Sequence, residues 1–350
     1  MQGAPPMKVV VCEAQVPFIR GGAEALSQEL VREFRDRGFD TELISLPFKW
    51  YPQEEVLAHA AMWRLADLSE STGQPIDLLV ATKFPSYFAR HPRKVTWLVH
   101  QHRAAYELVD TPYSDFGHRE FDVALRDRIL ALDNQMLGEC RGLFTISANI
   151  SRRLQRFNGL DSTPLYHPPR LASRLKAGTA GDYVLSVGRL ESVKRVDLAI
   201  RAMPHVPGSL SLCIAGTGTH AATLHALVDS LGLSSRVRFL GEVSNDDLIE
   251  LYAGALAVVF PPFDEDYGYV TLEAFLSHKP VVTTTDAGGP NEFITDGANG
   301  WVTAPDPRAL AEAIRSLDAD RRKSARMGDE GYDLARGITW SGVIDRLTSA

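Results

Sequence analysis

The sequence predicts an α/β fold of two doubly wound, Rossmann-like domains that face each other across a central cleft. Short apolar runs rich in β-branched residues alternate with helical patterns along the chain. The alternation pauses over residues 161–181, which are rich in Pro, Gly, Ser and Thr, and then restarts. The length of 350 residues also exceeds one core of typical size. We expect an N-terminal domain at 1–170 and a C-terminal domain at 171–350, whose last helix packs back on the first domain.

The first domain opens with an apolar run at residues 7–14 and a helix at 23–37. In that helix Leu26, Leu30 and Phe34 keep a helical period, and Gly38 supplies the stop. Further strands are predicted at residues 41–46, 76–82, 94–100 and 142–147. Runs this short and apolar are typical of parallel strands that are buried on both faces.

The second domain repeats the alternation. Strands are predicted at residues 182–190, 210–218, 236–243, 255–262, 280–285 and 300–303. Helices are predicted at 196–206, 220–231, from 244 onward and at 269–277. Ser244 begins its helix with Asp247 three residues later, which is typical of a capping box.

Composition excludes several classes of protein. The net charge of −7 argues against general nucleic-acid binding. Cys12, Cys140 and Cys213 are odd in number and widely spaced, so we expect reduced, buried thiols of a cytoplasmic protein. No apolar run reaches 18 residues and the first residues lack the pattern of a secretory signal, so neither a spanning helix nor export is expected.

The most informative segment holds Glu265 and Glu273, which are separated by seven residues. Glu265 falls in the loop between a predicted strand and helix, and Glu273 falls in the helix. In an open α/β sheet this loop lies at the carboxyl ends of the strands, where ligands bind. Two acids beside a helix N-terminus that can receive an anion indicate a sugar or nucleotide site.

Other strand-end loops carry cations and glycines. Arg189 and Lys194 lie in a loop that leads into a helix, where two cations suit a diphosphate; a solvated charged loop is the alternative. Gly21 and Gly22 precede the first helix and offer backbone N–H groups, although short glycine turns are often only structural. The G-x-G-x-x-G fingerprint of a dehydrogenase is absent.

Two more strand ends carry candidate ligand-binding residues. His100 closes the strand at 94–100 and either binds a ligand or has a structural role, whereas His102 is expected to be exposed. The loop from Asp286 to Glu292 contains two glycines and is expected to supply backbone donors. The acidic tripeptide at 264–266 lacks the further ligands that a metal site needs, so no metal is expected.

Together and in this order, these motifs resemble the family 4 retaining glycosyltransferases of GT-B fold. The resemblance runs from about Met7 to the C-terminus. It implies that Arg189 and Lys194 hold the diphosphate of a nucleotide-sugar donor. It also implies that the backbone near Gly268, Val270 and Thr271 meets the phosphates.

The same resemblance assigns the remaining site residues. Glu273 would bind the nucleotide ribose, and Glu265 would contact the transferred sugar as a catalytic residue beside His100. Gly22 would lie over the donor phosphates or the acceptor, and the backbone at Val243 would meet the base. No cofactor or metal is implied, and the donor is expected to be linked to UDP or GDP.

The implied reaction is retaining transfer to a hydroxyl acceptor, which is a glycan, a lipid-linked sugar or a small molecule, as in polysaccharide biosynthesis. An epimerase, a phosphorylase or a non-catalytic sugar-binding protein are the alternatives. The chain departs from the family at Tyr166-His-Pro-Pro169, where many members have Asn-Gly-Val-Asp, and at Arg195, where many have glycine. Arginines between 126 and 156 form either a solvated helical face or a peripheral contact with anionic lipid at the inner face of the membrane.

Overall fold

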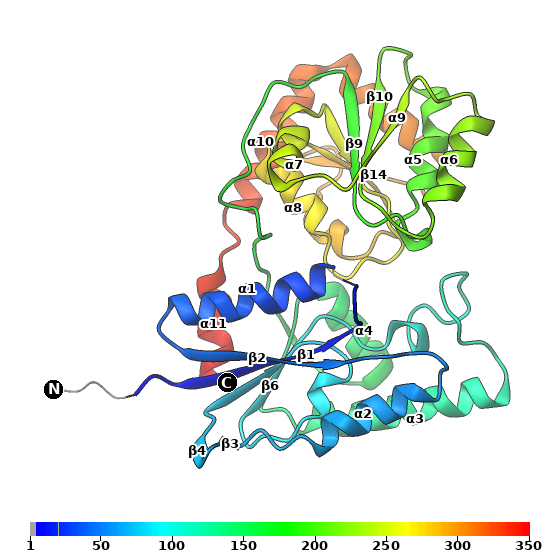
Figure 1. Ribbon diagram of the computed structural model, residues 1–350. Coiled ribbons are helices and arrows are strands. Elements are labelled where there is room, and N and C mark those ends of the chain that lie inside the picture. The colour runs from blue at the N-terminus through cyan, green and yellow to red at the C-terminus, as the bar shows by residue number, and fades with distance from the viewer. Residues whose placement is uncertain (1–4, 20) are drawn as a thin grey trace. The chain divides into compact units, whose positions relative to one another are not determined.

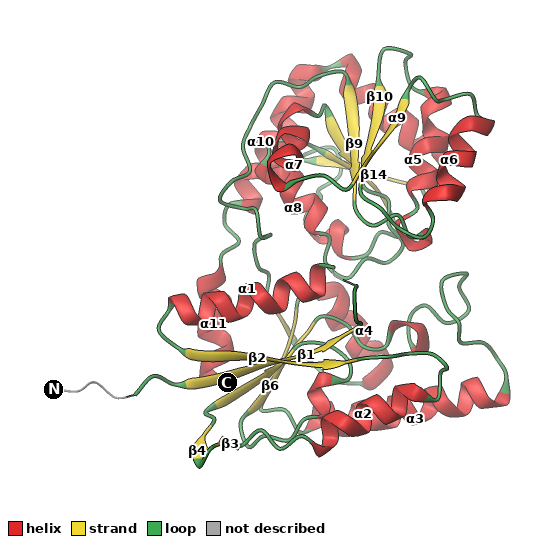
Figure 2. Ribbon diagram, viewed as in Figure 1, coloured by secondary structure: helices red, strands yellow, loops and turns green. Residues whose placement is uncertain are grey.

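The computed structural model describes residues 5–19 and 21–350. The chain folds into two compact units, Met1–His167 with Thr339–Ala350, and Pro168–Ile338. Each unit has a parallel six-stranded sheet, so both are doubly wound α/β units (Figure 2). The chain therefore leaves the first unit at His167 and returns to it for the last helix.

The sheet of the first unit has the strand order β2-β1-β5-β6-β7-β8. Its strands are β1 (Lys8–Gln15), β2 (Asp40–Pro47), β5 (Leu78–Ala81), β6 (Lys94–Leu98), β7 (Gly142–Thr145) and β8 (Thr163–Pro164), and β3 (Glu70–Ser71) and β4 (Gln74–Pro75) form a separate hairpin. The helices are α1 (Gly22–Asp36), α2 (Glu55–Leu65), α3 (Glu120–Gly138), α4 (Ala148–Asn158) and α11 (Trp340–Ser349). Helices α1 and α11 cover one face of this sheet, and α2 and α3 lie on the other (Figure 1). Both faces are covered, which is why β5 and β6 are buried along their whole length.

Helix α11 is fixed to the first unit by a cluster of aromatic rings. The Trp340 ring lies 5.9 Å from Trp97 and 5.5 Å from His167, and His167 lies 5.0 Å from Trp97. Arg93 Nε also donates a hydrogen bond to the carbonyl oxygen of Ala350 (3.2 Å). Burial lowers the pKa of His167 to about 3, so this ring is neutral inside the cluster.

The sheet of the second unit has the order β11-β10-β9-β12-β13-β14. Its strands are β9 (Tyr183–Val187), β10 (Ser211–Ala215), β11 (Val237–Gly241), β12 (Ala257–Val259), β13 (Val281–Thr284) and β14 (Gly300–Thr303). The helices are α5 (Val196–Ala202), α6 (Ala221–Ser230), α7 (Asn245–Gly254), α8 (Tyr269–Leu276), α9 (Pro307–Ala319) and α10 (Arg321–Ala335). Strand β9 is central, and β10 and β12 pair with its two sides.

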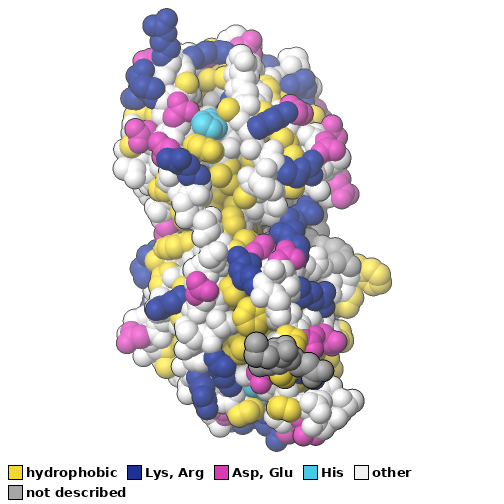
Figure 3. Space-filling view, turned by 90° about the vertical axis from the view of Figure 1, so that its left-hand side faces the viewer, with side chains coloured by type: hydrophobic (Ala, Val, Ile, Leu, Met, Phe, Trp, Pro, Cys, Tyr) yellow, Lys and Arg dark blue, Asp and Glu magenta, His cyan; other side chains and the backbone are white. Residues whose placement is uncertain are grey.

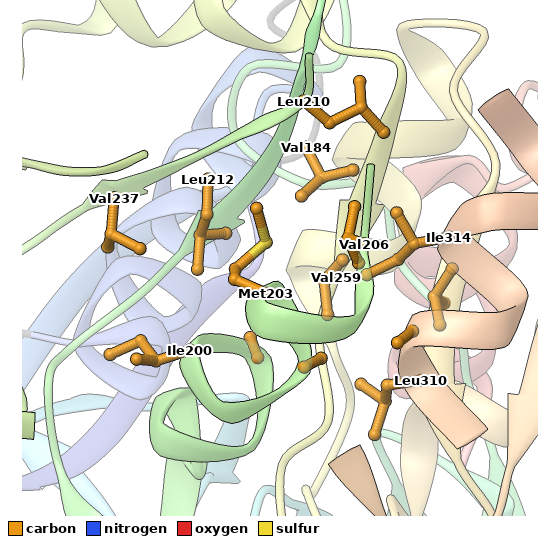
Figure 4. Close-up of a cluster of buried hydrophobic side chains, with 14 of the residues drawn as sticks. Val184, Ile200, Met203, Val206, Leu210, Leu212, Val237, Val259, Leu310 and Ile314 are labelled. Atoms are coloured by element: carbon orange, nitrogen blue, oxygen red, sulfur yellow. The ribbon is translucent and has the colours of Figure 1, made fainter. Parts of the chain in front are cut away.

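A continuous apolar core fills one side of this second sheet. Figure 4 shows Val184, Leu212 and Val259 of the strands beside Ile200 of α5 and Leu310 and Ile314 of α9. These side chains are almost completely excluded from solvent. Burial of each contributes roughly 1.5–3 kcal/mol relative to exposure, and the packed layer gives the strand-end loops a rigid base.

Prolines set several boundaries that differ from the sequence predictions. The predicted helix at 196–206 ends as α5 at Ala202 and continues as a 3-10 turn, Met203–His205, which contains Pro204. The predicted strand at 255–262 is shorter in the structure, where β12 ends at Val259, because Pro261 and Pro262 have no N–H to donate. The expected linker at 161–181 is not free of structure, since β8 within it pairs with β7.

The three cysteines are free thiols; Cys12 and Cys213 are buried and Cys140 is half-buried. Burial raises the pKa of the Cys140 thiol. Basic and acidic side chains are interspersed on the molecular face in Figure 3. No helix in residues 5–19 and 21–350 combines the length and apolarity needed to span a bilayer.

Candidate functional site

The central feature of the second unit is a group of loops that follow the adjacent strands β9, β12 and β13. Lys194, after β9, forms an ion pair with Glu265, after β12. Their side chains are only 16% and 18% exposed. Because parallel strands end at the same edge of a sheet, this pair lies at the carboxyl edge, as the sequence predicted for ligand-binding residues.

The loops after β12 and β13 are joined through their backbones. Glu265 N–H donates to the Ala287 carbonyl, and Gly289 N–H donates to the Glu265 carbonyl, both at 2.7 Å. A side chain at Gly289 would place its Cβ 2.7 Å from the Tyr267 carbonyl oxygen, so this close approach needs glycine. The Gly288-Gly289 loop, which the sequence indicated as a source of backbone donors, therefore uses its Gly289 N–H to hold Glu265 in place.

Arg189 lies in the loop after β9 and is exposed. Its guanidinium has no hydrogen bond or ion pair within the described part of the chain. The loop itself is held by the segment after β10, since Gly188 N–H donates to the Ala215 carbonyl and Leu190 N–H to the Thr217 carbonyl. Arg189 is thus an uncommitted cation, meaning that its guanidinium is unpaired within the described residues, and its backbone is held in place.

Arg195 follows Lys194 and occupies the left-handed region of backbone space, with φ 49° and ψ 40°. This conformation costs a residue other than glycine roughly 1–2 kcal/mol. The guanidinium nevertheless donates hydrogen bonds to the carbonyls of Pro261 and Pro262 and forms a two-pronged pair with Asp286. Burial raises the pKa of Asp286, but hydrogen bonds from Arg195 and Thr284 outweigh that effect and lower it overall. Sequence reasoning noted this arginine only as a departure from glycine.

The N-terminus of α8 lies just after Glu265. Gly268 caps the helix with φ 91°, and an added Cβ would lie 2.7 Å from Pro290 Cγ. Thr271 N–H donates to the Gly268 carbonyl (2.9 Å), and Val270 is 9% exposed. The Thr271 hydroxyl is buried and finds no hydrogen-bond partner in residues 5–19 and 21–350. This end of the helix therefore combines a partial positive charge with an unused polar group.

Glu273 lies on the next turn of α8, where the Tyr252 hydroxyl donates to its Oε2 (2.7 Å). Burial raises the pKa of Glu273 to about 7, although Tyr252 and Arg170 act in the opposite direction. Tyr252 comes from α7 and is completely buried. The sequence offered no local signal for this contact, which joins two residues 21 positions apart in different helices.

Val243 lies between β11 and the N-cap of α7 and is half-buried. Ser244 Oγ accepts a hydrogen bond from Asp247 N–H (3.1 Å), which confirms the predicted start of that helix. Since β11 is parallel to β10, Val243 lies at the same carboxyl edge of the sheet as the other candidate residues.

In the first unit, Gly22 begins α1, and the preceding Gly21 donates its N–H to Glu24 Oε2 (2.8 Å). Glu24 also pairs with Lys83, and both side chains are about 10% exposed. The α1 N-terminus therefore already holds a carboxylate of its own chain. Arg20, the neighbouring cation of the predicted loop, lies outside the described residues.

The two histidines after β6 differ in their surroundings. His100 Nδ1 lies 2.7 Å from the Gln101 carbonyl oxygen, and the His100 carbonyl accepts from Phe84 N–H. His102 was expected to be exposed, and this is wrong. Its ring packs 5.5 Å from Phe84 and 5.8 Å from Phe116, and burial lowers its pKa to about 4. His102 is a neutral member of an aromatic cluster.

The arginines between 126 and 156 are divided between α3, α4 and the loop before β7. Arg153 is buried and pairs with Glu107, and Arg156 lies over the Phe157 ring. They do not form one uniform basic face. Within the described ranges, no group of three or more His, Cys, Asp or Glu residues has an arrangement that could hold a metal ion.

Residues 172–334, which cover nearly all of the second unit, match the family model described as glycosyl transferases group 1. The second unit is thus similar to the group 1 glycosyltransferases. A D-inositol 3-phosphate glycosyltransferase from Thermobifida fusca is 29% identical over 69% of this chain and 59% of its own length. The lipopolysaccharide core biosynthesis glycosyltransferase LpsE from Rhizobium meliloti is 34% identical over 47% and 48% of the two chains. This chain spans only 53–59% of the length of the first two curated relatives.

Solved structures show the same fold over 98% of the chain. Anabaena HepE, in complex with UDP and glucose, superimposes with a TM-score of 0.74 at 20% identity and covers 98% of this chain and 100% of its own. Sucrose-phosphate synthase from Thermosynechococcus elongatus gives a TM-score of 0.73 at 18% identity, with 98% of each chain covered. These matches confirm the predicted GT-B fold.

Proposed function

We propose that this protein transfers a sugar from a nucleoside diphosphate donor to a hydroxyl acceptor, with retention of configuration and without a metal ion. The observation that carries the proposal is the arrangement after β9 and β12: an uncommitted Arg189, the Lys194–Glu265 ion pair and the N-terminus of α8. Two cations and a helix N-terminus complement the charge of a diphosphate. A single carboxylate among them is suited to sugar hydroxyls.

Each group has a separate part in the proposed reaction. The acceptor oxygen attacks the anomeric carbon on the face that the nucleotide leaves, the bond to the diphosphate oxygen breaks, and that oxygen takes the acceptor proton. Arg189 and Lys194 stabilise the negative charge that develops on the leaving diphosphate. Glu265, held by its backbone bonds to the loop after β13, accepts hydrogen bonds from the transferred sugar. Glu273 receives the ribose hydroxyls.

The first unit is proposed to bind the acceptor. His100 follows the end of β6 and is the histidine that would contact the sugar, since His102 is enclosed by phenylalanines. Gly22 would present the start of α1 to the donor or acceptor. A lipid-linked acceptor and a peripheral membrane contact stay predictions, as does the cytoplasmic location.

The first donor to test is a UDP-sugar. A solved structure of HepE holds UDP-glucose, and HepE shares this fold. The similarity to HepE favours UDP over GDP as the nucleotide of the donor, a choice that the sequence left open. Thermal-shift titration with UDP, GDP and ADP identifies the base before any acceptor is known.

Replacing either cation tests the proposal. Arg189→Ala and Lys194→Ala should each reduce kcat by roughly 10²–10³-fold, because each removes one preorganised contact with developing charge. Turnover is measured as release of nucleoside diphosphate with the donor found by thermal shift. Arg315→Ala is the matched control, since Arg315 is an exposed arginine of α9 in the same unit and should retain full activity.

The alternatives give different outcomes in the same assay. A non-catalytic binding protein would bind nucleotide without releasing diphosphate, an epimerase would turn over without an acceptor, and a phosphorylase would depend on phosphate. Turnover close to wild type in both cation variants would contradict the assignment of the diphosphate site.

A further inference from the structure

Arg195 makes an unusual set of contacts for a residue that touches none of the proposed reacting groups. Its guanidinium donates to Pro261 O (2.9 Å), Pro262 O (2.7 Å) and Thr284 Oγ1 (2.9 Å). It also donates to both carboxylate oxygens of Asp286, at 2.8 and 2.6 Å. The side chain is only 11% exposed, so these bonds are largely shielded from water.

These contacts join three loops that the sequence keeps far apart. Arg195 itself ends the loop after β9, the two prolines lie in the loop after β12, and Asp286 lies in the loop after β13. The loops after β12 and β13 are also joined to each other by the Glu265 and Gly289 backbone bonds. Arg195 therefore contacts all three loops, and it joins the loop after β9 to the two loops that are already paired.

The position of Lys194 depends on this connection. Lys194 is the residue before Arg195, and its partner Glu265 lies three residues beyond Pro262. A hydrogen bond from Phe263 N–H to the Val193 carbonyl (2.8 Å) also holds the loop after β12 against the loop after β9, on the other side of Lys194. The left-handed backbone at Arg195 turns the chain so that Lys194 faces Glu265 while the arginine side chain reaches Asp286.

We propose that Arg195 is a positioning residue: its guanidinium fixes the loop that carries Lys194 against the loop that carries Glu265, and it contacts no substrate. The inference rests on the proposed donor site. A glycine here would adopt the same backbone without strain, but it would leave the three loops without this shared anchor. Arginine at this position adds backbone strain, but its side chain makes the site more rigid.

The test compares Arg195→Gly with a second arginine of the same chemistry. Arg236 also donates five hydrogen bonds to backbone carbonyls, those of Met203, Val206, Pro207 and Leu210. It precedes β11 and so lies at the amino edge of the sheet, away from the proposed site. Arg236→Ala removes a comparable structural clamp and should leave kcat within about twofold of wild type, whatever it does to the melting temperature.

Arg195→Gly should lower kcat by roughly 10–100-fold, because small errors in placing a catalytic contact cost factors of this size. The KM for the donor should change by less than about threefold, and Arg195→Lys should recover only part of the loss, because lysine cannot form the two-pronged pair with Asp286. In a Lys194→Ala background, Arg195→Gly should have almost no further effect on kcat, since its action passes through Lys194. An undiminished effect in that background, or unchanged kcat in the single variant, would overturn the proposal.

Failure of the proposed function is recognised separately. If the wild-type protein turns over no UDP-, GDP- or ADP-sugar, the glycosyl-transfer proposal fails before any variant is compared. The contacts of Arg195, here called the clamp, are then tested by hydrogen exchange. The amides of residues 188–194 should exchange faster in Arg195→Gly, and their exchange rate should not change in Arg236→Ala. Equal protection of that segment in both variants would refute the clamp itself.

Discussion

At the scale of single residues, Glu273 has a charge that changes near neutral pH. Burial raises the pKa of its carboxyl to about 7, against an ordinary value near 4.3 for glutamate. A folded-state pKa above the unfolded value means that the folded protein holds the proton more tightly between these two pH values. The stability from this group is therefore present at low pH and is lost as the pH rises toward 7.

A ligand that hydrogen-bonds to the carboxylate reverses this preference. If Glu273 accepts the ribose hydroxyls, nucleoside diphosphate should bind roughly three- to fourfold more tightly at pH 8 than at pH 6, because hydrogen bonds to a charged acceptor are about 1 kcal/mol stronger than those to a neutral one. Titration calorimetry at both pH values measures the change. Glu273→Gln has no proton to lose, so its affinity should vary only with the charge of the nucleotide. The same pH dependence in wild type and variant would contradict the ribose contact.

Single residues also show which contacts could be predicted from the sequence and which could not. Lys194 and Glu265 were each placed in a strand-end loop by local patterns, and their ion pair follows from the parallel sheet. Arg195 and Tyr252 act through partners that are far away in the sequence, and no local pattern encodes such contacts. His102 was misjudged for the same reason, because its phenylalanine neighbours come from other segments.

At the scale of elements, the loops that follow the strands are fixed by contacts between backbones. Gly216 has φ 133°, and an added Cβ would lie 2.0 Å from the Gly188 carbonyl oxygen. Residues 215–218 form the turn at the end of β10. The structure gives it a supporting position, because it packs against the loop that carries Arg189.

Gly216→Ala should therefore weaken both folding and donor binding. The added methyl group must displace the Gly188 carbonyl, so we expect a loss of several kcal/mol in unfolding free energy and weaker nucleotide binding. Gly232→Ala is the control: Gly232 has φ 65° but nothing lies within 4 Å of its Cβ position. It should lose only about 1 kcal/mol and bind nucleotide normally. Denaturant unfolding and thermal-shift titration measure the two effects, and equal losses in both variants would contradict the supporting role.

At the scale of the whole molecule, the alternation of strands and helices was sufficient to predict the fold, because buried parallel strands have a clear apolar signature. Boundaries failed at Pro204, Pro261 and Pro262, where missing N–H groups ended elements that apolar character would have extended. The chain also crosses between units twice, after His167 and after Ile338. The second crossing depends on which surface accepts α11, and this is decided by the packing of Trp340 on Trp97 and His167.

Trp340→Ala should destabilise the first unit alone. Truncating a buried tryptophan costs about 3–5 kcal/mol, and loss of its aromatic contacts lies within that range. Hydrogen exchange should accelerate in β6 and β7 while β9 and β10 keep their protection. Trp301→Ala, at a half-buried tryptophan of β14 that lies under Lys323, should affect the second unit instead. If Trp340→Ala exposed β9 and β10 as strongly as β6, the C-terminal helix would stabilise the whole chain, and its assignment to the first unit would fail.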